Sequence, residues 1–388
     1  MDNIENLEEI IDLTFGSVSV YGFLNAVTAV IFAALMAFVT TPIVRVIAFK
    51  TGAVDDPKRD NRRMHKTPTP RLGGLAVFFS FVVSVFLFYG VSNFTLSMIA
   101  GAFLLIIVGI LDDVFRDKIR AVIKLLVQIA AAGLVVWQGE VLIERVNIFG
   151  RYIHFGYFSV PLTVFWIVGI INAVNLIDGL DGLSCGIATI SAVSLLLVTI
   201  LLGDFRLALL IAILAGSCLG FLPFNINPAK IFIGDTGATF LGYILAVVSI
   251  QGLFKAQAVI TFIIPFLILA VPIFDTTFAI IRRVLTGRHP FSADRGHLHH
   301  RLIDMGFNKK QTVRILYAVS ALLGVSSIMF VTHKIIYALV IIAISLGISF
   351  AMWIIFRDEK MKTESGIIPE NGNGHNHNKD KGSEDGQA

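Results

Sequence analysis

The sequence predicts an all-α, polytopic integral membrane protein of about 11 transmembrane helices, with its functional groups on the cytoplasmic face. Three observations support this fold class. Of the 388 residues, 56% are hydrophobic and only 15% are charged, whereas a soluble domain averages about 25% charged residues. The apolar residues form long blocks, many of them long enough to cross a hydrocarbon core of about 30 Å. The basic residues gather in alternate connecting segments. These features exclude a soluble globular protein, a disordered chain and a coiled coil.

Apolar runs of spanning length predict the helices one after another. In chain order they cover residues 21–48, 73–90, 94–111, 121–138, 160–177, 183–202, 206–223, 237–254, 257–281, 314–332 and 335–356. The predicted organisation is an extracytoplasmic segment (1–20), a multi-span body (21–356) and a tail (357–388) whose lack of apolar periodicity is typical of disorder. Residues 139–159 alternate apolar and polar side chains around two glycines, which predicts a short hairpin.

Lys and Arg residues orient the predicted spans. With the N-terminus outside, the inside segments hold 23 of these residues and the outside segments hold 5. Positive charge collects on the cytoplasmic side of membrane proteins, so the tail is predicted to be cytoplasmic. The net charge of +4 is then an orientation signal, and no nucleic-acid partner is needed to explain it. The acidic N-terminus does not resemble a cleaved secretory signal.

Two cysteines and two tail histidines are interpreted without a functional role. Cys185 and Cys218 lie in apolar stretches, where they are expected to be small buried hydrophobic residues. His375 and His377 lie in the polar tail, which favours solvated side chains over a metal site.

Five polar clusters interrupt the apolar pattern, and all lie on the predicted cytoplasmic side. Ionisable groups at membrane depth usually mark a site. The first cluster is a basic loop ending at Arg71, just before two glycines that open a span; its arginines also fit an ordinary positive-inside loop. The second is Asp112-Asp113, at the end of the third span. Adjacent carboxylates repel each other and oppose the helix dipole, which a Mg²⁺ ion would offset. The alternative is a solvated acidic helix end.

The third cluster lies in the stretch NAVNLIDGLDGL. Asn172 and Asn175 are one turn apart and share a helix face, and Asp178 and Asp181 follow among glycines that end the helix. Unwound backbone at membrane depth is tolerated only where it lines a cavity or is buried in protein. Two amides and two carboxylates without a partner would be costly there, so this cluster favours a functional cavity.

The fourth cluster precedes the eighth span. Asn225 and Lys230 are followed by Asp235 within GDTG. Asp235 or the following threonine could be a helix N-cap. The same geometry suits a phosphate at a helix start, with the carboxylate holding a metal ion that bridges phosphates.

The fifth cluster joins the ninth and tenth spans. It contains Arg282, His297, His299 and His300. Imidazoles could bind a transition metal, but the HExxH spacing of zinc proteases is absent. Arginines beside the histidines favour phosphate or diphosphate binding, and a solvated loop is the remaining alternative.

Together these stretches resemble the polyprenyl-phosphate N-acetylhexosamine-1-phosphate transferases of glycosyltransferase family 4. The similarity covers about Asp56 to Leu302, and its most specific pieces are GILDD, NAVNLIDGLDGL, PAKIFIGDTGATFLG and ADRGHLHHRL. The resemblance implies a membrane enzyme that transfers a sugar 1-phosphate from a UDP-sugar to a polyprenyl phosphate, releases UMP and requires Mg²⁺ or Mn²⁺. It also implies a bacterial cytoplasmic membrane, with the active site and C-terminus cytoplasmic and the N-terminus outside.

The stretch HLHHRL resembles the branch that uses UDP-N-acetylglucosamine and initiates cell-envelope polysaccharide or teichoic acid synthesis. The peptidoglycan branch, the phospho-N-acetylmuramoyl-pentapeptide translocases, usually carries three consecutive histidines. Arg116 replaces the lysine that this other branch shows after its paired aspartates, and a longer segment after Asp113 leaves the facing of Lys124 undecided.

The resemblance implies a role for each cluster. Asp235 and Asp112 are expected to hold the metal ion, and Asp113 or Asp112 to accept a proton from the lipid phosphate or to hold it for attack. Asp178 and Asp181 are expected to bind the nucleoside or support the metal site. The remaining expected substrate contacts are Arg71, Asn172, Asn175, Asn225, Lys230, Arg282, His297, His299 and His300. A direct displacement is favoured over a covalent aspartyl-phosphate.

The expected partners are a UDP-N-acetylhexosamine, undecaprenyl phosphate and the lipid bilayer, with a homodimer left open. A secondary transporter and a membrane-embedded metal hydrolase remain as alternative classes. A transporter would place its ionisable residues near the bilayer midplane within inverted repeats, and no internal repeat is evident here.

Overall fold

The computed structural model describes residues 20–55, 68–115, 119–148, 151–254, 263–287 and 296–347. The chain divides into two units, Met1–Ser345 and Leu346–Ala388, and the architecture below is that of the first. The predictions for residues 1–19 and for the tail with His375 and His377 lie outside the described residues.

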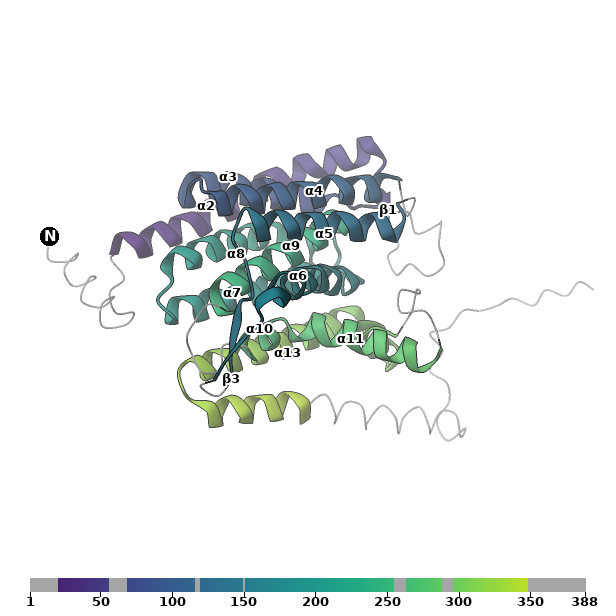
Figure 1. The fold of residues 1–388 in the computed structure, drawn as a ribbon. Coiled ribbons are helices and arrows are strands. Elements are labelled where there is room, and N and C mark those ends of the chain that lie inside the picture. The colour runs from purple at the N-terminus through teal and green to yellow at the C-terminus, as the bar shows by residue number, and fades with distance from the viewer. Residues whose placement is uncertain are drawn as a thin grey trace, which may run out of the picture. The chain divides into compact units, whose positions relative to one another are not determined.

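Helices make up nearly all of the described structure (Figure 1). From the N-terminus up to residue 176, the helices are α2 (Val20–Thr51), α3 (Gly73–Ser84), the π-helical turn η2 (Val85–Tyr89), α4 (Asn93–Phe115), α5 (Ala121–Trp137), the 3₁₀ turn η3 (Gly156–Phe158) and α6 (Ser159–Leu176). Those after it are α7 (Leu183–Leu201), α8 (Phe205–Asn225), α9 (Gly234–Ser249), the π-helical turn η4 (Ile250–Phe254), α10 (Ile263–Ile268), α11 (Ala270–Leu285), α12 (Leu298–Asp304), α13 (Lys309–Val331) and a last helix, Ile335–Gly347.

Six of the described helices combine the length and apolar composition needed to cross a membrane: α2, α4, η3 with α6, α7, α8 and α13. Shorter apolar helices include α3 with η2, α5 and Ile335–Gly347. The chain is therefore a multi-pass membrane protein. The predicted span 257–281 differs, because its described part is two helices that meet at Leu269. Pro272 in the first turn of α11 explains the new start, since proline is favoured where backbone N–H groups have no helical partner.

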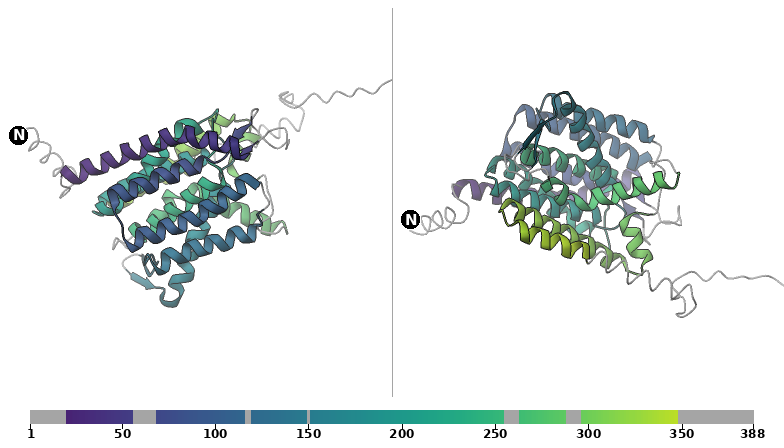
Figure 2. Two further views of the ribbon diagram at one scale, coloured as in Figure 1. Left: turned by 90° about the horizontal axis from the view of Figure 1, so that it is seen from above. Right: turned by 60° about the horizontal axis from the view of Figure 1, so that its bottom comes forward.

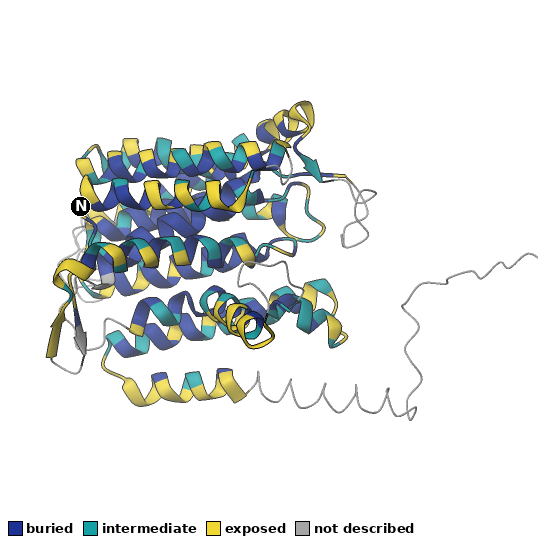
Figure 3. Cartoon of the chain, turned by 45° about the vertical axis from the view of Figure 1, so that its right-hand side comes forward, coloured by how far each residue is buried: buried dark blue, intermediate teal, exposed yellow. Residues whose placement is uncertain are grey.

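Helix α9 is the centre of the bundle. Every residue of α9 except Asp235 is buried, and the helix packs against α3, α4, α6 and α7. A helix that is apolar on all sides belongs in the interior of a large bundle, and Figure 3 shows the buried class concentrated along the central helices. The one partly exposed residue of α9 lies in its first turn, at the end where the loops of the candidate site meet.

The outer helices turn large apolar side chains away from the bundle. Helix α2, purple in Figure 2, packs on α8 and α3 through alanines such as Ala29, Ala33 and Ala37. On its other face Leu35 and Val39 are about 60% exposed. Contiguous exposed apolar surface of this kind suits contact with lipid.

The predicted hairpin and the interpretation of the cysteines are confirmed. Strands β3 (Arg145–Ile148) and β4 (Arg151–His154) pair antiparallel, with Arg145 opposite His154. Cys185 and Cys218 are buried free thiols. A second ribbon, β1 (Val54–Asp55) with β2 (Thr69–Pro70), leads the chain towards the start of α3.

Candidate active site

Asp113 caps the start of α9 from another helix. The side chain of Asp113, on α4, accepts hydrogen bonds from the backbone N–H of Asp235 (3.3 Å) and from both the N–H (3.1 Å) and the hydroxyl (2.7 Å) of Thr236. The N-cap residue of α9, Ile233, has no side chain that could do this, and the first N–H groups of a helix need acceptors. Gly234 adopts φ +70°, which glycine tolerates best. Asp113 therefore joins the ends of α4 and α9.

Arg71 bridges two of the predicted carboxylates. Its guanidinium lies 3.5 Å from Asp113 and 3.7 Å from Asp235. Backbone hydrogen bonds hold the segment in place, because the N–H of Phe232 donates to Pro70 and the N–H of Gly73 donates back to Phe232. The end of the basic loop, residues 68–73, and the GDTG stretch thus form one structural unit, although more than 150 residues separate them.

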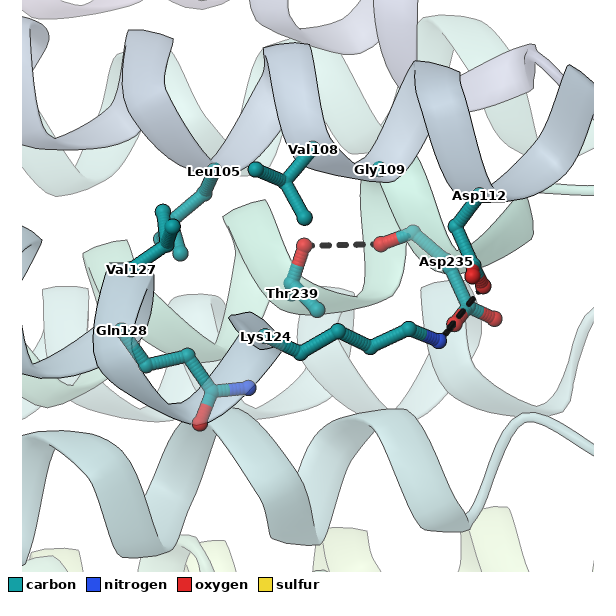
Figure 4. Close-up of a pocket in the computed structure, with 9 residues that line it drawn as sticks. All are labelled: Leu105, Val108, Gly109, Asp112, Lys124, Val127, Gln128, Asp235 and Thr239. Atoms are coloured by element: carbon teal, nitrogen blue, oxygen red, sulfur yellow. Dashed lines mark hydrogen bonds and ion pairs between the residues drawn. The ribbon is translucent and has the colours of Figure 1, made fainter. Parts of the chain in front are cut away.

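Lys124 lies between Asp112 and Asp235, so Asp235 contacts both cationic side chains. Its Nζ is 2.5 Å from Oδ2 of Asp112 and 3.0 Å from Oδ2 of Asp235, and Figure 4 shows its extended side chain reaching both. The sequence did not decide which way the Lys124 side chain points, and the structure places its ammonium group at the centre of the site. Three carboxylates here face two cationic side chains.

A small cavity of about 20 Å³ lies beside Lys124, with room for about one water-sized group. Asp112, Asp235 and Gln128 line its polar side, while Leu105 and Val127 belong to its apolar wall (Figure 4). The cavity therefore has the charged cluster on one side and apolar side chains of α4 and α5 on the other.

The residues of this cluster fit a magnesium ion. Oδ1 of Asp112 is buried and has no hydrogen-bond partner, and the donor set is made of carboxylate oxygens. Among the residues that the structure describes, no group of three or more His, Cys, Asp or Glu gathers to enclose a metal ion. Mg²⁺ is commonly held by only one or two carboxylates, with water and substrate phosphates completing its coordination. Asp112 and Asp235 could supply those two carboxylates.

The two predicted amides on α6 differ in their contacts. Asn172 donates a 2.7 Å hydrogen bond to Oε1 of the buried Gln128 and another of 2.7 Å to the carbonyl of Val168. Asn175 lies one turn later, and no hydrogen bond from its amide to any described residue is present. Asn172 thus helps to hold Gln128 at the cavity wall, and Asn175 is the more available of the two amides.

The aspartates after α6 also differ. Oδ2 of Asp181 accepts hydrogen bonds from the Asn227 side chain (2.8 Å) and from the N–H of Ala229 (3.1 Å), which fastens this loop to the one before α9. Asp178 is half-buried. Desolvation raises the pKa of Asp178 to about 8, and the guanidinium of Arg71 opposes this shift. The carboxylates of the neighbouring aspartates, Asp235 first, reinforce it.

Asn225 and Lys230 shape the turn before α9. The amide of the buried Asn225 donates to the carbonyl of Ile231 at 3.0 Å, which closes the turn. The ammonium of Lys230 lies 5.9 Å from the centre of the Phe224 ring, and the residue is exposed to solvent. Asn225 therefore has a structural contact, and Lys230 remains accessible.

The histidine cluster packs on the loop that holds Asp178. His297 and His299 are buried, and their stacked rings have centres 5.9 Å apart. The ring centre of His300 lies 4.3 Å from that of His299. A Cβ atom on Gly179 would lie only 2.2 Å from Nε2 of His299, so only glycine permits this approach. Burial lowers the pKa of His299 to about 4, which keeps the imidazole neutral at pH 7. Arg282 donates to the carbonyl of Gly296 at 2.7 Å and anchors the cluster to α11.

Three contributors escaped sequence reasoning: the position of Lys124, the buried amide of Gln128, and Asp275 on α11, which contacts His297 at 2.9 Å. Asp275 and Lys124 are ionisable residues within predicted apolar spans, and such residues are functional candidates by default. An ionisable residue within an apolar run is a sequence signal that could have identified both Asp275 and Lys124.

Comparisons with known proteins place the chain among membrane-lipid sugar-phosphate transferases. A family model described as Glycosyl transferase family 4 matches residues 95–253. The chain is 41% identical over 325 residues to a probable undecaprenyl-phosphate N-acetylglucosaminyl 1-phosphate transferase of Bacillus subtilis, covering 83% of this chain and 89% of that protein. It is 37% identical over 317 residues to a decaprenyl-phosphate N-acetylglucosaminephosphotransferase of Mycobacterium tuberculosis (74% and 77% covered). A phospho-N-acetylmuramoyl-pentapeptide-transferase of Staphylococcus saprophyticus is 31% identical over 313 residues (76% and 95% covered).

Proposed function

This chain belongs to glycosyl transferase family 4, and on that premise we propose that it transfers N-acetylglucosamine 1-phosphate from UDP-N-acetylglucosamine to undecaprenyl phosphate and releases UMP. The observation that carries the proposal is the cluster of Arg71, Asp112, Lys124 and Asp235 at one end of a membrane bundle. Two relatives named for N-acetylglucosamine transfer, at 41% and 37% identity, are more similar to this chain than the pentapeptide transferase at 31%, which supports this donor. The product would initiate a cell-envelope polysaccharide or a teichoic acid.

The reaction joins two phosphate-bearing anions. An oxygen of undecaprenyl phosphate attacks the β-phosphorus of the UDP-sugar, and the bond from that phosphorus to the bridging oxygen breaks, so that UMP leaves with the electron pair. Positioning and charge neutralisation provide most of the catalysis in phosphoryl transfer. Arg71 and Lys124 are the cationic side chains of the cluster, and they would offset the repulsion between the substrates.

Asp112 and Asp235 would hold Mg²⁺ or Mn²⁺. When bound, the metal ion neutralises charge on the diphosphate and on the transferred phosphoryl group. Lys124 now contacts both carboxylates, so it is placed to turn from them towards substrate phosphate when another cation binds there. Leu105 and Val127 of α4 and α5 line the cavity beside this point, and apolar side chains there suit an acceptor with a long hydrocarbon tail.

The contacts of the paired aspartates separate their roles. Both oxygens of Asp113 accept hydrogen bonds from the first turn of α9, which leaves Asp113 poorly suited to act as base or nucleophile. Asp112 retains a buried oxygen without a partner. We assign contact with the acceptor phosphate to Asp112 and favour a direct displacement over a covalent intermediate on Asp113.

The remaining groups would bind the donor. Asp178 and Asn175 face the nucleoside in this assignment, and the neutral His299 with its neighbours contacts the diphosphate or the sugar. The site would lie on the cytoplasmic face of a bacterial cytoplasmic membrane, with the N-terminus outside.

One assay tests the function against its alternatives. Purified protein should release UMP from UDP-N-acetylglucosamine only when undecaprenyl phosphate and Mg²⁺ are both present, and it should prefer this donor to UDP-N-acetylmuramoyl-pentapeptide. UMP released without a lipid acceptor would indicate a hydrolase. Uptake of a solute into vesicles without UMP release would indicate a transporter, and preference for the peptide-bearing nucleotide would assign the other branch.

A further inference from the structure

Asp275 is a buried acid on the inward face of α11. The residue is 3% exposed. Residues Val271, Asp275 and Ala279, which are spaced by one turn, are buried, whereas Phe274 and Phe278 point outward and are more than half exposed. A carboxylate on the buried face of a helix is costly unless it is paired. The groups that contact the Asp275 carboxylate therefore indicate its role.

Both oxygens of Asp275 are used by the histidine cluster. Oδ2 lies 2.9 Å from Nδ1 of His297, and Oδ1 accepts a 2.6 Å hydrogen bond from the backbone N–H of Leu298. An ionised carboxylate can only accept hydrogen bonds. In this contact Nδ1 of His297 therefore donates a hydrogen bond to the carboxylate, which leaves Nε2 of His297 unused by Asp275. Leu298 is the first residue of α12, so the same carboxylate also fixes the start of this helix.

A continuous set of contacts runs from Asp275 to the aspartate loop. The ring of His297 is parallel to that of His299 within 7°. His299 in turn packs on Gly179, the residue between Asp178 and Leu180, at a distance that excludes any side chain there. A displacement of His297 would therefore shift His299 and, through it, the loop that carries Asp178.

We propose that Asp275 is a positioning residue of this transferase: it holds His297 in the tautomer with Nδ1 protonated and seats the histidine cluster against Gly179. The inference rests on the proposed function, because it assigns Nε2 of His297 to the diphosphate or sugar of the donor. Asp275 itself contacts no substrate. Carboxylates that orient a ligating histidine typically affect binding or activity by about 10–100-fold.

A double-mutant cycle tests the proposal. We expect Asp275→Asn and His297→Gln each to lower kcat/KM for UDP-N-acetylglucosamine by about 10–100-fold, and the double variant to be no worse than the poorer single variant. Non-additive losses are the signature of two residues that act through one interaction. Thr277→Val, on the exposed face of the same helix, is the matched control and should retain the parental kcat/KM.

Two outcomes would overturn the positioning role: wild-type kcat/KM in Asp275→Asn, or losses that multiply in the double variant. If Asp275→Asn yields no folded protein, the cycle is run with Asp275→Glu, which keeps the charge and displaces the carboxylate, and the same non-additivity is expected.

Calorimetric titration with UDP separates this inference from the proposed function. If the wild type binds UDP but transfers no sugar phosphate to undecaprenyl phosphate, the proposed function fails and the cycle is read from UDP affinity. Non-additive losses of affinity would then support Asp275 as the residue that positions His297, whereas additive or absent losses would overturn it.

Discussion

At the residue scale, neighbouring acids of one motif make different contacts. Asp112 and Asp113 are adjacent in the chain. Asp113 accepts hydrogen bonds from the first turn of α9, whereas Asp112 contacts Lys124 and lines the cavity. Helix periodicity explains the difference, because successive residues point about 100° apart around the axis. A pair of acids in a sequence therefore need not be a pair in function.

Asp235→Asn should abolish transfer while leaving the protein folded. The amide retains one oxygen but loses the charge that Lys124, Arg71 and a metal ion require, and we expect turnover to fall by about 100-fold or more. UMP release measured over a series of Mg²⁺ concentrations checks this. Glu144→Gln, an exposed change beside the hairpin, is the control. Near-normal turnover in the variant would remove Asp235 from the metal role.

Lys124→Met should separate metal binding from turnover. The lysine now contacts the two carboxylates proposed for the metal ion, so its removal should let Mg²⁺ protect the protein against heat at a lower concentration. Turnover should nevertheless fall, because a cation that offsets phosphate charge is lost. Thermal melting in a Mg²⁺ titration is the measurement. A rise in the concentration needed would show that Lys124 helps to bind the metal ion and does not compete with it.

His299 should make stability fall in acid. Its pKa of about 4 in the folded protein lies below the ordinary 6.5, so the unfolded chain binds more protons between these values and stability is lost as pH falls through this window. Asp178 acts in the opposite sense, because its raised pKa favours the folded state as pH falls from about 8. The melting temperature of His299→Gln should therefore fall less from pH 7.5 to 5 than that of the parent. The groups facing His299 are His297, His300 and Asp275, and equal falls in both proteins would exclude His299 as the cause.

At the element scale, α9 depends on α4 for its start. The three hydrogen bonds to Asp113 replace a cap that the helix does not carry itself. This dependence also shows what could be predicted from sequence. The apolar runs predict the helices because they depend on local composition, and the Lys and Arg asymmetry predicts that the five clusters share one side of the membrane. The hydrogen bonds of the cap join Asp113 to residues more than 120 positions later in the chain. They depend on the packing of α4 against α9 and could not be predicted from local sequence.

Asp113→Ala and Asp112→Ala should therefore fail in different ways. Loss of the Asp113 carboxylate leaves N–H groups of α9 without acceptors and should cost about 1.5–3 kcal/mol of stability, seen as a lower melting temperature with or without Mg²⁺. Loss of Asp112 removes a carboxylate near Asp235, so melting should change little while transfer is lost. A stable, inactive Asp113→Ala would instead assign Asp113 a direct part in the reaction.

At the scale of the whole molecule, the candidate site belongs to the bundle and not to any one segment. Residues from α4, α5, α9 and the segment before α3 form the charged cluster, while α12 and its N-cap supply the histidines and α11 supplies Asp275. Sequence reasoning placed these clusters on one face through the positive-inside rule, which is a property of the entire chain. It could not resolve the exposed apolar face of α2 from its buried face of alanines, because both faces are apolar.

The tail from Glu359 onward is predicted to be dispensable for catalysis. It contains none of the five clusters, and its acidic residues weaken any attraction of its basic residues to an anionic leaflet, which is worth about 1 kcal/mol per basic residue. A chain ending at Asp358 should keep its catalytic rate with a short soluble acceptor. A tenfold loss with folded protein retained would show that the tail reaches the active site.

The cap on α9 has a consequence for how the chain is made. Synthesis delivers Asp113 to the membrane long before Thr236 leaves the ribosome. Until then the carboxylate has Arg71 beside it, and none of its hydrogen-bond donors from α9 exists. The innermost helix of the bundle is thus among the later ones to be synthesised, and until it packs on α4 the Asp113 carboxylate lacks the three hydrogen bonds that it accepts in the folded protein. A nascent chain interrupted before Gly234 would lack all three donors and would therefore keep an incompletely paired carboxylate at the end of α4.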